Sequence, residues 1–149
     1  MKNEIEYKLR DILTDIISAL FVLLFLYAAI SKLKDYEKFQ IQLGKSPILS
    51  TFAFFFAGLV PALEIGIAML LMIKRLQLLA LYAAFSLMVI FSVYIVFILN
   101  FGEYIPCSCG GVLANFSWTQ HFWFNIAFVI LGVIGVLIYP YQNKVFTAR

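Results

Sequence analysis

Cys107 and Cys109 are the two cysteines of the chain, and they lie two positions apart in the stretch IPCSCGGV. A structural disulfide stabilises mainly by closing a loop in the unfolded chain, and so small a ring contributes only about 1.6 kcal/mol. Strained bond geometry in that ring offsets the gain. Strained, exposed disulfides are also the ones that exchange readily with other thiols. The spacing therefore favours thiol–disulfide exchange over a structural cross-link.

The residues around the pair agree with exchange chemistry. Pro106 restricts the backbone on one side, while Gly110 and Gly111 permit unusual backbone angles and close approach by a partner. No acidic residue occurs between Glu103 and the end of the last apolar segment. A thiolate in this loop would therefore meet little charge repulsion.

His121 follows the cysteine loop and is the only histidine of the chain. It is a candidate proton donor to a leaving thiolate, and the alternative is an interfacial histidine without a redox role. The candidate catalytic residues are thus Cys107, Cys109 and His121. A metal site is the weaker interpretation, because these residues offer at most three soft ligands and lack a C-x-x-C spacing. We expect no metal.

Glu64 is the second candidate, because it lies deep in the apolar stretch LVPALEIGIA. An ionisable group near the middle of a membrane is costly and is by default a hypothesis for a functional site. The alternative is a protonated carboxyl that bonds a buried Tyr or Ser of another helix and fixes packing. Lys32, the other intramembrane polar candidate, is expected to extend to the outer interface rather than pair with Glu64. Helical spacing puts four residues on the face of Glu64: Ala57, Pro61, Ala68 and Leu71.

The composition indicates the environment of these residues. The chain is 64% hydrophobic and 13% charged, whereas soluble domains are about half apolar and about a quarter charged. Such a chain cannot cover its core with polar surface, so part of its solvent is lipid. The net charge of +3 is small and does not indicate binding to nucleic acid.

Four apolar segments are long enough to cross a bilayer as helices, a length of about 18–25 residues. They cover roughly residues 12–33, 52–73, 77–101 and 122–139. The sequence therefore predicts an all-α membrane protein, a bundle of four transmembrane helices forming a single integral membrane domain over residues 1–149. A cysteine loop would span 102–121. We also expect a short interfacial helix in the first loop, and a second packing face on the second helix, made of Gly58, Ala62 and Gly66.

The orientation follows from the basic residues. With both termini in the cytoplasm, the inner side carries seven lysines and arginines and the outer side four, which the positive-inside tendency favours. The cysteine loop then lies outside, where disulfides persist. The first segment is interpreted as an uncleaved helix rather than a signal peptide, since its flank is acidic and no Ala-x-Ala cleavage site follows it.

Three stretches carry a resemblance to a known family: AAISKLKDYEKF, VPALEIGIAMLL and IPCSCGG. In their order and loop placement they resemble the MauE/DoxX group of small four-helix bacterial membrane proteins, over nearly the whole chain. The resemblance implies a multi-pass protein of the bacterial inner membrane with a redox-associated role. MauE is regarded as an accessory in maturing a disulfide-rich enzyme subunit, alongside a thioredoxin-like partner. The residues carried over are Cys107, Cys109, Glu64 and Lys32.

The architecture is also similar to DsbB and the vitamin K epoxide reductases, which pass electrons from thiols to quinones. That similarity raises quinone as a cofactor, but those relays use two cysteine pairs and this chain has one. Either the single pair does both jobs, or it exchanges only with a soluble partner.

Two hypotheses of different classes follow. In the first, the chain is a membrane thiol–disulfide redox protein that exchanges electrons between the Cys107/Cys109 pair and an extracytoplasmic thioredoxin-like partner or secreted substrate, and onward to quinone. If it is an enzyme, it is a thiol–disulfide oxidoreductase. In the second, it is a non-enzymatic membrane anchor or scaffold subunit of a cell-envelope complex, and the cysteine loop is a docking surface. A small-solute transporter has only Glu64 in its favour.

Overall fold

The computed structural model describes residues 2–46, 49–101 and 117–140. Its four long helices are α1 (Lys2–Lys34), α3 (Ala53–Leu71), α4 (Gln77–Phe101) and α5 (Trp118–Ile138). A short helix α2 (Tyr36–Gly44) follows α1, and a 3₁₀ turn η1 (Ser50–Phe52) precedes α3. Each long helix is long and apolar enough to cross a membrane. The predicted all-α fold with four membrane-spanning helices is confirmed, and α2 is the short helix expected in the first loop.

Two predicted boundaries were wrong. Helix α1 begins at Lys2 rather than at residue 12, because the charged N-terminal flank continues the helix beyond the apolar segment. Helix α5 begins at Trp118 rather than at residue 122, because Ser117 caps it. The Ser117 hydroxyl accepts a hydrogen bond from the Gln120 amide at 3.3 Å, and the Gln120 side chain accepts one from the Ser117 amide at 2.9 Å. This reciprocal pair stabilises the first turn, and the predicted cysteine loop of 102–121 therefore ends earlier.

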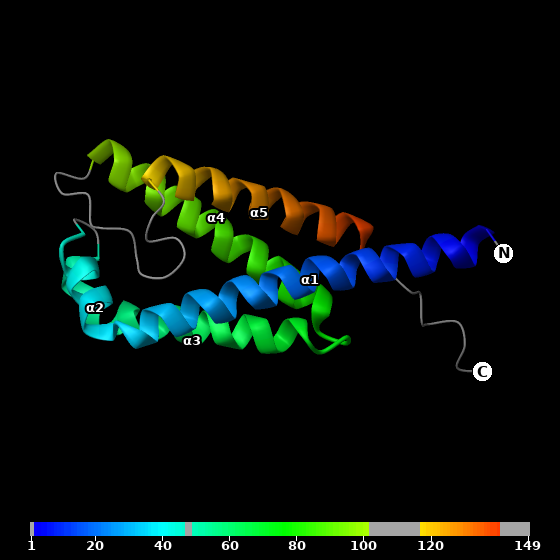
Figure 1. The fold of residues 1–149 in the computed structure, drawn as a ribbon, viewed down its shortest axis with the longest axis horizontal. Helices are drawn as coiled ribbons and strands as arrows, with labels where there is room; N and C mark the ends of the chain where they lie inside the picture. Colours follow the sequence, from blue (N-terminus) through cyan, green and yellow to red (C-terminus); the bar gives the residue numbers. More distant parts are fainter. Residues whose placement is uncertain (1, 47–48, 102–116, 141–149) are drawn as a thin grey trace.

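The helices pack as two pairs. Helix α1 lies along α3, and α4 lies along α5 (Figure 1). The pairs come together near the turn between α3 and α4 and separate toward the end where α2 lies (Figure 1). The buried core of the bundle includes Phe21 and Phe25 of α1 with Leu81 and Met88 of α4. It joins the two pairs in the half of the molecule nearer the α3–α4 turn.

Glycines bring α5 close to its neighbours. A Cβ atom built at Gly132 would lie 3.2 Å from the Phe85 Cβ of α4, and one built at Gly135 would lie 3.1 Å from the Ile17 Cγ2 of α1. Both distances are shorter than ordinary van der Waals contact, so a larger side chain at either position would push the helices apart. The close packing of α5 thus depends on residues without side chains.

The predicted second packing face of α3 was wrong for this chain. Gly58 and Ala62 are exposed, and a Cβ atom built at Gly66 would have no neighbour within 4 Å. Helix α3 packs against α1, α2 and α4 and lies at the edge of the bundle (Figure 1). An edge helix has one buried face, and that face is the one that contains Glu64.

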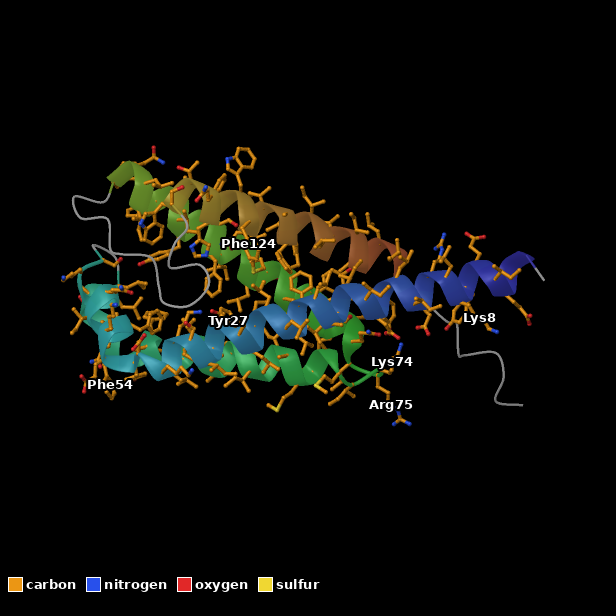
Figure 2. The ribbon with its side chains drawn as sticks, in the orientation of Figure 1. Lys8, Tyr27, Phe54, Lys74, Arg75 and Phe124 are labelled. Carbon is orange, nitrogen blue, oxygen red and sulfur yellow. The ribbon has the colours of Figure 1, made fainter. Side chains whose placement is uncertain are left out.

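A polar cluster closes the end of the bundle at the α3–α4 turn. Lys74 of the turn donates to Asp15 Oδ2 at 2.6 Å and to Asp11 Oδ1 at 3.2 Å, both on α1. The hydrogen bond to Asp15 is the main cause that raises the pKa of Lys74 above its ordinary value. Gln77 of α4 bonds Asp15 as well, at 3.0 Å. Lys74 and Arg75 lie at the opposite end of the molecule from Phe54 (Figure 2), so these two basic residues mark the end expected to be cytoplasmic.

The glycine contacts give a first prediction. Gly132→Leu should lower the free energy of unfolding by about 1–3 kcal/mol, because the new side chain overlaps the α4 backbone at Phe85. Gly66→Leu is the matched control, since it makes the same change on a helix where the site is open. Melting curves of both purified variants in one detergent provide the measurement. Equal melting temperatures would show that α5 does not pack on α4 as described.

Candidate functional site

Lys32 and Glu64 form an ion pair between α1 and α3. Lys32 Nζ donates to Glu64 Oε1 at 2.7 Å. The Glu64 side chain is fully buried, and 14% of the Lys32 side chain is exposed. The prediction that Lys32 extends outward and does not pair with Glu64 was therefore wrong, as was the expectation of a Tyr or Ser as the partner of Glu64. Lys32 turns inward because a buried carboxylate without a counter-charge would cost far more than bending one flexible side chain.

The buried face of α3 places Glu64 against α1. Ala57, Pro61, Ala68 and Leu71, which share this face at helical spacing, are all buried. The predicted face is confirmed. Ala68 packs in the core with Ile17 and Phe21 of α1, whereas Ala57 packs with Phe39 and Leu43 of α2.

Aromatic rings from two further elements complete the surroundings of the ammonium group. Lys32 Nζ lies 5.9 Å from the ring centroid of Phe39 on α2 and 5.9 Å from that of Phe91 on α4. Rings at this distance attract a cation through their quadrupole, and more strongly when water is excluded. Lys32 is thus the point at which α1, α2, α3 and α4 meet. Phe39 and Phe91 were not predicted as part of the site, since no local pattern distinguishes them from other membrane phenylalanines.

A cavity of about 370 Å³ lies beside this ion pair. That volume falls at the lower end of the range of about 300–1,000 Å³ for small-molecule sites. All five α-helices contribute to its lining, which is largely aliphatic and aromatic. The charged and amide side chains that line it are Lys32, Gln42, Glu64, His121 and Asn125. An apolar cavity with a few convergent polar groups is the usual form of a ligand site.

His121 lies in the first turns of α5 and lines the same cavity. It is partly buried, and its ring lies 6.3 Å from that of Trp118, centroid to centroid. Its Nδ1 has no hydrogen-bond partner among the described residues. The structure thus brings three of the five sequence-predicted site residues, Lys32, Glu64 and His121, to one cavity. Asn125, which is buried one turn further along α5, also lines it.

A second buried atom at the site has an unmet hydrogen-bonding capacity. Glu64 Oε2 is fully buried and finds no partner within the described part of the chain. Buried polar atoms are nearly always paired, so each exception calls for an explanation such as a bound water or ligand. The cavity beside Glu64 is the place where such a group would lie.

The other two predicted residues, Cys107 and Cys109, lie in residues 102–116, outside the described residues. Their role stays a prediction. Across 2–46, 49–101 and 117–140, no group of three or more His, Cys, Asp or Glu residues has a metal-binding arrangement.

Comparison with known protein families gives a match to the family described as "Methylamine utilisation protein MauE". The match covers residues 10–138, which includes α3, α4, α5, most of α1 and the connection that carries both cysteines. The searches of curated proteins and of solved structures gave no match.

The ion pair leads to a double-mutant prediction. Lys32→Met and Glu64→Leu should each destabilise the protein by about 3–5 kcal/mol, because either change leaves one buried charge without its partner. The double variant should be close to the parent in stability, since two apolar side chains of similar volume then replace the pair. Lys34→Met, on the exposed side of the same turn of α1, is the control. Thermal melting of the four variants measures the coupling, and additive single effects would mean that the two charges do not interact.

Proposed function

This chain belongs to the MauE family of membrane proteins, and on that basis we propose that it is a thiol–disulfide redox protein. Its Cys107/Cys109 pair exchanges electrons with an extracytoplasmic thioredoxin-like protein or a secreted substrate. The observation that carries the proposal is the position of the helix ends next to the cysteine pair. Cys107 follows the last residue of α4, Phe101, by six positions, so the chain keeps it within about 20 Å of that end.

The helix ends on both sides of the pair support a shared location with the polar cavity. Helix α5 begins at Trp118, which lines the cavity together with His121. The stretch that carries the cysteines therefore connects α4 to α5, which begins at the end of the bundle where Lys32 and His121 lie, away from the Lys74 cluster. Under this proposal, the exchange partner acts at that end of the bundle, on one side of the membrane.

The proposed exchange is a two-step thiol transfer. A thiolate of one cysteine attacks the disulfide of the partner, forms a mixed disulfide and releases one partner thiolate, which takes up a proton. The second cysteine, as thiolate, then attacks the mixed disulfide and releases the other partner thiol. The partner gains a pair of electrons and two protons, and this chain gains the Cys107–Cys109 disulfide. The reverse sequence oxidises the partner.

We propose an orientation with both termini in the cytoplasm. The Lys74–Arg75 turn then lies on the cytoplasmic side, as the positive-inside tendency favours. The cavity end faces the extracytoplasmic side, where thioredoxin-like and secreted partners are found and disulfides persist.

The orientation predicts which thiols a reagent reaches. A membrane-impermeant maleimide added to intact spheroplasts, after mild reduction, should label Cys107 and Cys109. A variant with both cysteines replaced by serine, carrying a new cysteine in place of Arg75, should be labelled only after the membrane is permeabilised. The opposite pattern would reverse the topology and place the pair in a reducing compartment.

The exchange chemistry predicts a trappable intermediate. In Cys109→Ala the resolving thiol is absent, so Cys107 should accumulate a mixed disulfide with a discrete partner in cells, visible as a gel shift that dithiothreitol removes. Cys107→Ala tests the reverse assignment, and the double serine variant is the negative control. A partner that copurifies equally well with the double serine variant would instead favour the anchor or scaffold function, in which the loop docks without exchanging electrons.

A further inference from the structure

The side chains that line the cavity divide it into a polar end and an apolar end. Lys32, Gln42 and His121 come from the end of α1, from α2 and from the start of α5, which lie together at one end of the molecule (Figure 1). Leu24 and Phe25 line the other end, and Leu24 precedes Lys32 by eight positions, or about 12 Å along a helix. The molecule that matches such a cavity is an amphiphile, with one polar end and one apolar end.

We propose that this cavity binds an uncharged, single-chain lipid with a hydroxylated headgroup, of the monoacylglycerol class. The hydroxyls of the headgroup bond Glu64, Lys32 and His121, and the acyl chain lies along the apolar walls. The inference goes beyond the proposed exchange function, because it rests on the cavity and uses neither cysteine.

Hydrogen bonding selects hydroxyl groups on the headgroup. Glu64 Oε2 and His121 Nδ1 are buried atoms with no hydrogen-bond partner among the described residues. The carboxylate oxygen needs a donor, whereas the ammonium group of Lys32 can only donate and needs an acceptor. A hydroxyl offers both functions, but it has a single donor, which Glu64 Oε2 uses. An unprotonated His121 Nδ1 therefore requires a second hydroxyl.

Charge selects an uncharged headgroup. Lys32 and Glu64 neutralise one another, with Nζ and Oε1 2.7 Å apart. A charged headgroup would bring an uncompensated charge among apolar side chains, and burying that charge costs far more than one further hydrogen bond returns. A free fatty acid has the same chain with an ionised carboxylate, so this reasoning selects against it.

The apolar end selects an acyl chain over water. A water molecule bonded to Glu64 Oε2 would satisfy that atom, but the cavity has a volume of about 370 Å³ and its lining is largely aliphatic and aromatic. Cavities with apolar walls hold no ordered water. A hydrocarbon chain fills such a space and gains free energy by burying apolar surface.

The cavity also opens toward the surface that lipid covers. Leu63 of α3 and Ile90 of α4 line the cavity, yet 43% of Leu63 and 61% of Ile90 is exposed. Both residues lie on helices that can span the membrane, and the two helix pairs separate on this side of the core (Figure 1). A lipid can therefore enter sideways from the bilayer.

Trp118 provides a direct readout of binding, because it lines the cavity. The chain has two tryptophans. Trp123 is 64% exposed, so Trp123→Phe leaves Trp118 as the only indole. The probe is a monoacylglycerol with a dibrominated stearoyl chain, since bromine quenches indole fluorescence on contact. The detergent is lauryldimethylamine oxide, which has no hydroxyl group that would compete with the probe.

The probe should quench Trp118 with a saturable curve. Its dimethyl ether, which keeps the chain but has no hydroxyl donor, should bind about tenfold more weakly. In Lys32→Met/Glu64→Leu, which removes both charges without leaving one unpaired, the probe and its ether should bind with nearly equal affinity. Lys34→Met should keep the parent's preference for the probe. Dibromostearic acid, tested at alkaline pH where its carboxyl is ionised, should bind more weakly than the probe.

Three results would overturn the proposal. Quenching that rises linearly without saturation would mean that the probe only partitions into the micelle. Equal affinity of the parent for the probe and its dimethyl ether would mean that the cavity takes any acyl chain. Tighter binding of dibromostearic acid would mean that the site selects a charged headgroup. The first two comparisons use the parent chain, so they hold even if the double variant does not fold.

Discussion

The ion pair between Lys32 and Glu64 is the constraint around which the half of the bundle nearer α2 is built. A single charge at this depth would be costly, whereas a pair at 2.7 Å carries no net charge. Forming the pair requires that α1 and α3 lie side by side, with small residues between them. It also requires that other side chains shield the rest of the ammonium group from solvent. The rings of Phe39 of α2 and Phe91 of α4 lie there. One polar contact thereby specifies the relative positions of four helices.

The two ends of the molecule are consequently different. Near the α3–α4 turn, the core of Phe21, Leu81 and Met88 fills the space between the helix pairs, and glycines of α5 allow close packing. The Lys74 hydrogen bonds to α1 close that end. At the other end the pairs separate (Figure 1), and the space between them is the cavity beside Lys32. A tightly packed half thus holds the helices while the other half can accommodate a ligand.

Hydropathy and helical periodicity were enough to predict the four spans and the buried face of Glu64, because both depend on residues within one helix. The pairing of Lys32 with Glu64 was not predictable in this way. It depends on which helices are neighbours, and on α2 placing the Phe39 ring beside the Lys32 ammonium group. The small residues Gly58, Ala62 and Gly66 were misread for the same reason: their spacing suits close helix packing. Among the described residues, however, only the Tyr36 hydroxyl of α2 comes near Gly58, and a Cβ atom built at Gly66 meets nothing within 4 Å. The start of α5 was available in the sequence, as Ser117 and Gln120 have the spacing of a capping box.

The connection that carries Cys107 and Cys109 joins two helices that both line the cavity. It leaves α4 at Phe101 and enters α5 at Trp118, a residue of the cavity wall. Cys109 precedes Trp118 by nine positions, a length of chain that spans at most about 30 Å. Under the proposed function, a partner that exchanges electrons with this pair would therefore act at the end of the bundle where the cavity lies.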